Sequence, residues 1–345
     1  MAVIDAVANS IRIPLWRLFG GASNSVTTDI TIPIVTPNEA AQLAAKYRGQ
    51  GFQTLKLNVG KNLNSDMEVL KAIRLVHPDC SFILDANEGY TSKQAIEVLD
   101  RLNEMGVTPV LFEQPVHRDD WEGLRDVSVA AMERYRVAVA ADESCRSLLD
   151  AQKIIHGNLA HVINIKLAKM GVLGALEVID AARKAGIALM IGGMVETRIA
   201  MGFAGHLAAG LGCFSFIDLD TPLLLSEDPV YGGYEAVATC ERVSASSVSR
   251  TIIPPARAPA RQPNRSPTLR APTPPPPTPT EPSGFDALKD TFSVDVAAAE
   301  ARPLDMPLAA PFTIASSRLD AVSNVAVRVE LSSGAVGWGG RAQSK

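Results

Sequence analysis

The chain has 345 residues, 47% of them hydrophobic, which is enough to build the core of one large domain or two ordinary ones. Its formal net charge of −4 and the lack of a long basic block do not indicate nucleic-acid binding. No apolar run is as long as a membrane span. The composition therefore favours a globular protein that acts on a small molecule.

The cysteines and the first residues bear on location. The four cysteines show no C-x-x-C spacing, which is typical of reduced thiols in a cytosol-like compartment. The opening MAVIDAVANS has neither a basic region nor a small-residue cleavage site, so we expect no secretory signal and predict a cytoplasmic location.

Residues 1–21 are predicted to form an amphipathic helix that leads into the main domain. Val3, Ile4, Val7 and Ile11 share one helical stripe, and two glycines follow the segment. Pro14 is expected to kink this helix.

The main domain, predicted over residues 22–243, alternates β-branched runs with helix-period segments, which indicates βα units and a parallel sheet. Seven helical patterns separate eight predicted strands, and the segment after the eighth strand has the composition of a loop. The strands are expected at 29–34, 54–59, 81–86, 109–114, 137–142, 162–167, 188–193 and 214–219. Because no GxGxxG loop follows the first strand, a (β/α)7β TIM-type barrel fits better than an open dinucleotide-binding sheet.

Three acidic residues close three successive predicted strands. Asp85 ends FILDAN, Glu113 lies in VLFEQP and Asp142 in VAVAADES, at spacings of 28 and 29 residues. This is about the length of one strand-plus-helix unit, so the carboxylates are expected at one rim of the sheet. They repel one another unless a cation lies between them, and oxygen ligands favour a hard ion. The sequence therefore predicts one Mg²⁺ ion at this rim.

Lysines are expected inside the same barrel. Lys56 and Asn58 are two residues apart on one strand and so point to the same side, and Lys166 ends the run INIK. A lysine beside a metal in an apolar barrel can act as a general base, so that a metal-bound carboxylate substrate would lose its α-proton. The alternative for each lysine is a structural ion pair, and both interpretations stay open.

Asp218 and Asp220, in FIDLDTP, share one face at the end of the last predicted strand. Two acids at a barrel mouth would attract a cationic group such as an ammonium. Loop capping and solvated charge are the alternative.

After the barrel the composition changes. Residues 244–290 are rich in Pro, Ser and Arg, contain very few acids, and predict a disordered linker. Their composition also resembles an organelle transit peptide, so organelle targeting stays open. Residues 291–345 predict a small antiparallel β element, with runs at 294–299 and 325–331 and a turn at Ser333 and Gly334, which must dock on the barrel or stay loose.

At these motifs the chain resembles the enolase superfamily, in the mandelate racemase and muconate lactonising branch, and most of all its L-Ala-D/L-Glu dipeptide epimerases. The resemblance covers nearly all of residues 1–235 and depends on TLKLN, LDANEGY, LFEQPVHRDD, ADES, INIKLAKMGV, GGMVETRIA and DLDTPLLL. It implies that Asp85, Glu113 and Asp142 bind Mg²⁺ and that Lys166 is an acid/base at the substrate's α-carbon. It also implies that Asp218 and Asp220 hold the dipeptide's ammonium. The C-terminal piece resembles the start of the family's capping domain, which would place Arg318 in a loop that closes over the substrate.

Two features depart from this family pattern. The family has K-x-K on the second strand, where the second lysine is the opposite base, but here Lys56 is followed by Asn58, which cannot take up a proton. We count Lys56 with the catalytic residues and Asn58 with the substrate-binding ones. The cap also follows the barrel and is incomplete. Either the order is a natural permutation, or the chain joins the end of one gene copy to the start of the next, which the transit-like linker favours.

The leading hypothesis is therefore a Mg²⁺-dependent dipeptide epimerase, impaired by Asn58 and by the incomplete cap. A one-base enolising enzyme, such as a dehydratase or cycloisomerase, and a catalytically inactive barrel are the alternatives. We expect a small dipeptide as partner and leave a homo-oligomer open.

Overall fold

The computed structural model describes residues 1–228, 230, 232–237, 240–243 and 293–342. The predicted linker at 244–290 lies outside these described residues. Among the described helices, none combines the length and the hydropathy needed to cross a bilayer.

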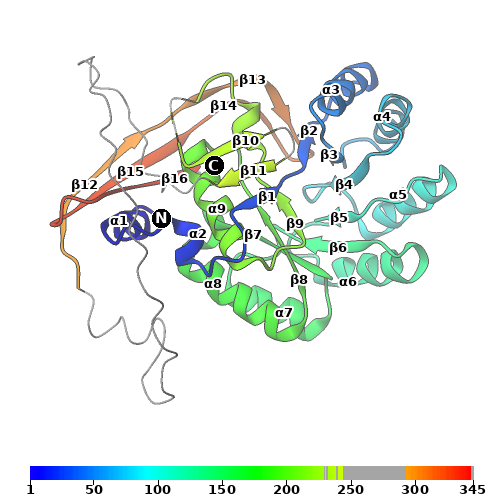
Figure 1. The fold of residues 1–345 in the computed structure, drawn as a ribbon. Helices are drawn as coiled ribbons and strands as arrows, with labels where there is room; N and C mark the ends of the chain where they lie inside the picture. The colour runs from blue at the N-terminus through cyan, green and yellow to red at the C-terminus, as the bar shows by residue number, and fades with distance from the viewer. Residues whose placement is uncertain (229, 231, 238–239, 244–292, 343–345) are drawn as a thin grey trace.

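Eight parallel strands form the centre of the molecule and follow one another in chain order (Figure 1). They are β2 (Ile30–Ile32), β3 (Thr54–Asn58), β4 (Ser81–Asp85), β5 (Leu111–Glu113), β6 (Ala138–Ala141), β7 (Val162–Lys166), β8 (Ala188–Gly192) and β9 (Phe216–Asp218). The backbone N–H of Asp29, just before β2, donates to the carbonyl oxygen of Ile217 in β9 at 3.1 Å. This hydrogen bond brings the last strand beside the first, as a barrel requires.

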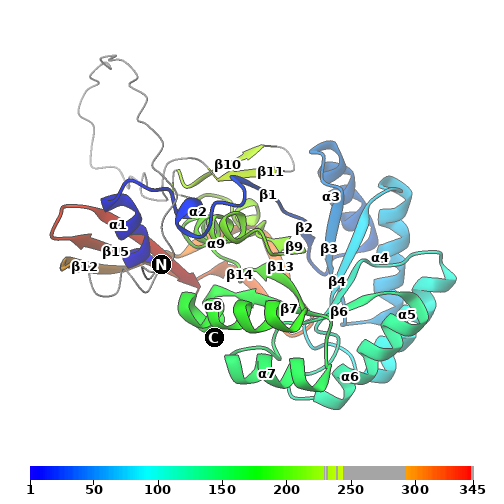
Figure 2. The ribbon, with the colours of Figure 1, turned by 60° about the horizontal axis from the view of Figure 1, so that its bottom comes forward.

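Seven helices connect these strands and surround them, as Figure 2 shows from a second direction. They are α3 (Pro37–Gly49), α4 (Leu63–Val76), α5 (Ser92–Glu104), α6 (Trp121–Ala130) with the π-helical turn η1 (Ala131–Tyr135), α7 (Leu148–Gly157), α8 (Leu167–Ala185) and α9 (Arg198–Leu211). Within the described residues, β9 is followed by the 3₁₀ turn η2 (Thr221–Leu224) instead of an eighth helix. The predicted (β/α)7β barrel is confirmed.

The period of two along each strand separates the packing layers. Residues that point outward, such as Leu55 and Leu84, pack against the helices in the main hydrophobic core. Residues that point inward form a second, smaller apolar layer inside the barrel, made by Ile83, Leu111, Ala140, Val162 and Met190. Two residues further along β4 and β5 the same inward side carries Asp85 and Glu113. The charged residues therefore lie directly above an apolar floor at the carboxyl ends of the strands.

The N-terminal segment forms two short helices, α1 (Ala2–Ser10) and α2 (Leu15–Leu18), and Pro14 caps the second. The predicted stripe is half right: Ile4 and Val7 are half-buried and pack against apolar clusters. Val3 and Ile11, however, are exposed, and the buried residues of α1 are Ala2, Asp5, Ala6 and Ala8. The reason is the close approach of a C-terminal strand. A Cβ atom on Gly337 would lie 2.1 Å from the backbone nitrogen of Ala6. The strand therefore needs glycine at this position, and the face of α1 that meets it has room only for small side chains.

A small antiparallel sheet was not predicted. It consists of β1 (Ser25–Thr27), β11 (Cys240–Val243) and β10 (Tyr234–Val237), in that order. Pairing between segments more than 200 residues apart leaves no local sequence signal, which explains why this sheet was missed.

The C-terminal region has five strands where two were predicted, and they are β12 (Val296–Pro303), β13 (Met306–Thr313), β14 (Arg318–Val322), β15 (Asn324–Leu331) and β16 (Val336–Ala342). The turn between β15 and β16 contains Gly334 at φ 80°, as expected for the predicted Ser-Gly turn. Strands β12, β15 and β16 make one sheet and β13 pairs with β14.

This C-terminal element docks on the barrel. The hairpin β13–β14 packs Phe312 and Leu319 against Val195 and Leu225, which lie in the loops after β8 and β9. In addition, the backbone N–H of Ile34 donates to the carbonyl oxygen of Thr313 at 2.8 Å. The hairpin thus covers part of the rim formed by the carboxyl ends of the strands. In Figure 1, α1 lies beside β15 and β16 on the side away from α4 and α5.

Candidate active site

Lys56 lies at the centre of a buried group of acids. It is on β3 and points into the barrel, and its Nζ lies 3.0 Å from Asp85, 2.8 Å from Glu113 and 2.7 Å from Asp218. Burial alone would lower the pKa of Lys56, but the attraction of Asp218, Asp85 and Glu113 outweighs it and raises this pKa well above its usual value. Lys56 therefore acts as a fixed cation among three carboxylates.

Asp142 binds two other lysines, one on each carboxylate oxygen. Its Oδ2 lies 2.6 Å from Nζ of Lys166, the last residue of β7, and its Oδ1 accepts a hydrogen bond from Lys169 in α8. Burial opposes ionisation, yet the two ammonium groups together hold the pKa of Asp142 below its usual range. The same contact raises the pKa of Lys166 against the effect of its burial. In this geometry both partners are charged.

Other acids surround this pair. Burial, together with repulsion from Asp85, raises the pKa of Glu113 to about 7. Burial and repulsion from Asp142 and Asp85 raise the pKa of Glu143 to about 8. Nδ2 of Asn164 on β7 donates to Oε1 of Glu113 at 2.6 Å. The carboxyl groups of this site outnumber its lysines, so the site has a surplus of acidic groups.

Asp218 and Asp220 lie together, as predicted from their spacing, and Asp29 joins them. Within the described part of the chain, these three acids form a group in which one carboxylate oxygen of each residue lies within 4.8 Å of one oxygen of each of the others. Oδ2 of Asp220 accepts from the backbone N–H of Thr31 at 2.6 Å. Burial and the neighbouring Asp218 raise the pKa of Asp220 to about 7. Asp85, Glu113 and Asp142 do not form so tight a group, because lysines lie between them.

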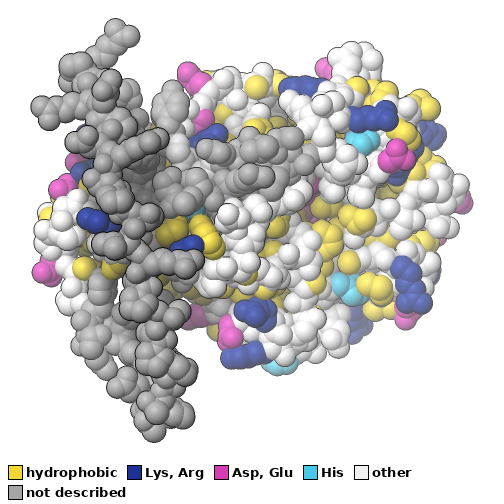
Figure 3. Space-filling view, in the orientation of Figure 1, with side chains coloured by type: hydrophobic (Ala, Val, Ile, Leu, Met, Phe, Trp, Pro, Cys, Tyr) yellow, Lys and Arg dark blue, Asp and Glu magenta, His cyan; other side chains and the backbone are white. Residues whose placement is uncertain are grey.

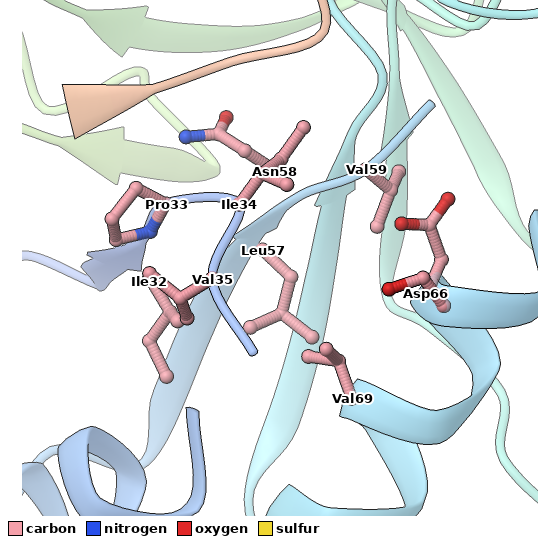
Figure 4. Close-up of a pocket in the computed structure, with 10 residues that line it drawn as sticks. Ile32, Pro33, Ile34, Val35, Leu57, Asn58, Val59, Asp66 and Val69 are labelled. Atoms are coloured by element: carbon pink, nitrogen blue, oxygen red, sulfur yellow. The ribbon is translucent and has the colours of Figure 1, made fainter. Parts of the chain in front are cut away.

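Asn58 stands two residues beyond Lys56, beside Asp85 on the neighbouring strand. It is 7% exposed, and its Nδ2 has no hydrogen-bond partner among the described residues. Figure 4 shows Asn58 and Leu57 on opposite sides of β3, beside a pocket that Ile32, Val59 and Asp66 also line. The next lysine along the chain, Lys61, is exposed to solvent on the loop after β3.

Arg318 is a predicted site residue that is exposed to solvent and pairs with none of the site's acids. It opens β14, its side chain is 62% exposed, and it pairs with Asp320 at 3.1 Å. Its proposed contact with a substrate remains a prediction.

Sequence reasoning missed several residues that hold the predicted ones in place. Gln114 uses its whole amide group: Oε1 accepts from the N–H groups of Asp142 and Ser144, and Nε2 donates to Val116 and to Ser144. Asn164 and Lys169 were missed as well, although both lie in the run INIKLAK and the period of two along INIK indicates an inward-facing Asn164.

Residues 39–239 match the family model described as enolase C-terminal domain-like. The chain belongs to this family. The resemblance stated from the motifs is thereby confirmed.

Similar proteins within the family are epimerases by name. The "L-Ala-D/L-amino acid epimerase" of Populus trichocarpa is 75% identical over 235 residues, which cover 68% of this chain and 56% of that protein. The chain thus spans a little over half the length of this relative.

Two solved structures are also similar. The substrate complex of the L-Ala-D/L-Glu epimerase from Bacillus subtilis matches with a TM-score of 0.68 at 34% identity, covering 71% of this chain and 68% of that one. The dipeptide epimerase from Enterococcus faecalis, complexed with Mg and the dipeptide L-Leu-L-Tyr, matches with a TM-score of 0.66 at 38% identity, covering 70% and 68%.

Proposed function

We propose that this chain is a Mg²⁺-dependent epimerase that removes the α-proton of a dipeptide such as L-Ala-D/L-Glu. The observation that carries the proposal is the position of Lys166, whose amine reaches the barrel mouth beside Asp142 and a surplus of carboxyl groups. The epimerase names of similar proteins support the reaction, and the Mg-dipeptide complex of one of them supports the cofactor and the substrate class.

The acids present fit a hard divalent cation. Asp85 and Glu113 are direct neighbours in the sheet, and both already bind a cationic group, the ammonium of Lys56. Asp142 follows on the next strand. These three residues would hold Mg²⁺ through oxygen atoms only. When bound, the ion supplies positive charge that stabilises the substrate's carboxylate as its α-carbon loses a proton.

Lys166 is the proton acceptor in this proposal. It has to release Oδ2 of Asp142, give up its extra proton to solvent and turn toward the substrate, where its neutral amine takes the α-proton. Return of a proton to the same face regenerates the starting epimer, so inversion needs a proton delivered to the opposite face. Asp218 and Asp220, with Asp29 behind them, offer negative charge to the free ammonium of the dipeptide.

The opposite face of the substrate has no comparable acceptor. Strands β3 and β7 lie on opposite walls, because four steps separate them in an eight-stranded barrel. On β3 the residue at the mouth is Asn58, whose amide cannot take up a proton, and Lys56 below it is bound to three carboxylates. We therefore propose that proton exchange at the Lys166 face is much faster than inversion.

The lack of a proton acceptor on the β3 wall favours a second candidate, an enolising enzyme that needs a single base, such as a dehydratase or a cycloisomerase.

Solvent exchange separates the candidates: L-Ala-L-Glu and L-Ala-D-Glu are incubated separately with the full chain and Mg²⁺ in D₂O and followed by proton NMR. Interconversion of the two epimers, even where it is much slower than exchange of one of them, supports the epimerase. Exchange of one epimer with no interconversion supports the one-base enzyme, and no exchange with Mg²⁺ bound supports an inactive barrel.

Asn58→Lys sharpens the same test. A lysine at this position would supply the missing acceptor on the β3 wall, so we expect interconversion of the two epimers to rise at least about tenfold. The exchange rate at the Lys166 face is the internal control. An unchanged rate of interconversion in a variant that still binds Mg²⁺ would show that another barrier limits inversion.

Two further predictions extend this proposal. We infer a cytoplasmic location from Cys80, Cys145 and Cys213, which form no disulfide within the described residues. The face in Figure 3 shows basic and acidic side chains interspersed, with no continuous basic patch, in agreement with a small-molecule partner.

A further inference from the structure

Lys169 lies in a single helical turn between β7 and a break in α8. Gly171, with φ 69° and ψ 176°, interrupts the helix two residues later, so this first turn is separate from the rest of α8. The side chain of Lys169 is 14% exposed and extends to the carboxyl ends of two neighbouring strands. It lies within the charged layer, although it belongs to no barrel strand.

The ammonium group of Lys169 has three acceptors. It donates to the backbone carbonyl oxygen of Asp142 at 2.5 Å, to Oδ1 of the same residue, and to the carbonyl oxygen of Asn164 at 3.4 Å. A lysine ammonium has three protons, so all of them are used. Lys169 thus ties the end of β6 to β7 and holds both the main chain and the side chain of Asp142.

Lys166 binds the same carboxylate in a different way. The charged group within reach of its Nζ in the described structure is Oδ2 of Asp142, at 2.6 Å, and the proposed reaction requires this contact to open. Lys169 has two main-chain acceptors in addition to Oδ1, so it stays in place when Lys166 moves. One lysine is anchored and the other is free to leave.

We propose that Lys169 is a positioning residue that keeps Oδ1 of Asp142 occupied and turns Oδ2 toward the cavity, so that Asp142 offers a single oxygen to a divalent cation. This inference depends on the proposed function, because it assumes that Asp142 is a metal ligand. It also explains how Asp142 keeps its orientation after Lys166 has moved away to the substrate.

The alternative is that Lys169 acts only through its charge, and the two roles predict opposite signs. A positive charge beside a metal ligand repels Mg²⁺, so removing it would tighten binding if charge were its only effect. If Lys169 positions Asp142, removing it weakens binding despite the gain in net negative charge. Lys169→Arg keeps the charge and changes the geometry, so charge alone predicts no change in this variant.

The test measures Mg²⁺ binding to the full chain by calorimetry, with MgCl₂ alone as the probe. We expect the dissociation constant to rise about tenfold or more in Lys169→Met and several-fold in Lys169→Arg. Lys184→Met is the matched control, because Lys184 lies on the same helix, is 75% exposed and pairs only with Asp180 among the charged groups of the described structure. Equal or tighter binding in Lys169→Met, or unchanged binding in Lys169→Arg, would overturn the proposal.

A second readout separates this inference from the proposed function. Hydrogen exchange of the metal-free protein is followed by mass spectrometry over residues 142–147. We expect exchange there to be at least about tenfold faster in Lys169→Met than in Lys184→Met, whether or not the wild-type chain binds Mg²⁺. Faster exchange without Mg²⁺ binding in the wild type would retain the positioning role and refute the metal site. Unchanged exchange would refute the positioning role itself.

Discussion

The barrel and the C-terminal β element are held together in different ways. The barrel has a continuous core of fully buried large side chains, including Phe82, Phe112 and Phe203, and its charged groups sit on top of an apolar floor. In the C-terminal element, every residue of β12 is exposed, and the buried positions are few. The barrel is therefore stabilised by its own packing, whereas the C-terminal element depends on where it docks.

Besides the apolar packing described above, several docking contacts involve the backbone of the C-terminal element. Gly337 approaches α1 without room for a side chain, and the N–H of Ala342 donates to Oε1 of Glu196 at 3.1 Å. The N–H of Trp338 donates to the buried carboxylate of Asp5 at 3.0 Å. Because the two regions are held together differently, a substitution in the barrel can alter the chemistry without disturbing the docking. A substitution at the docking contacts can likewise leave the barrel intact.

The largest effect is expected from a change inside the barrel. Lys166→Ala removes the proposed proton acceptor, so α-proton exchange into the dipeptide should fall by a factor of about 10³ to 10⁴. Exchange is measured by NMR in D₂O with Mg²⁺ present. Lys184→Ala, on the exposed side of α8, should keep the wild-type rate. Exchange that survives in Lys166→Ala would remove Lys166 from the mechanism.

A smaller effect is expected where the C-terminal element meets α1. Gly337→Val places a side chain 2.1 Å from Ala6 N and 2.2 Å from Ala2 O, so β16 should detach at a cost of about 3 kcal/mol. Hydrogen exchange should then quicken in residues 1–10 and 336–342 but remain unchanged in the barrel strands.

Gly174→Ala is the control for this substitution. Its Cβ would meet Met170 at an ordinary 3.5 Å, and the added methyl group should leave exchange at α1 and β16 as it is. If Gly337→Val left α1 and β16 as protected as in the wild type, the close approach would not be what holds the element in place.

The same contrast explains how much the sequence could predict. All eight barrel strands and the acids at their ends were predicted, because a strand repeats every two residues and the βα units have similar lengths. The predicted closeness of Asp218 and Asp220 follows from the same period. Arg318 came from resemblance alone, and no local pattern could show that it pairs with Asp320.

What the sequence could not predict depends on contacts between distant segments. The fully buried face of α1 is set by Gly337, more than 300 residues away, and hydrophobicity alone wrongly included the exposed Val3 and Ile11 in the packed stripe. Lys169 belongs to a helix by periodicity, but the break at Gly171 and the position of Asp142 give it its place in the site. Tertiary packing decided both cases.

The smallest effect is expected from the buried carboxyl group of Asp5. Burial raises its pKa from 3.8 to about 6, so its contribution to stability is complete below pH 3.8 and is lost as the pH rises through 6. Asp5→Asn keeps an oxygen that accepts from the N–H of Trp338 and cannot ionise. The variant should match the wild type near pH 4 and be more stable by about 1 to 2 kcal/mol at pH 8. Hydrogen exchange of α1 and β16 in both proteins, at pH 4 and at pH 8, measures this difference in stability. If the variant and the wild type differ by the same amount at both pH values, ionisation of Asp5 does not weaken the docking.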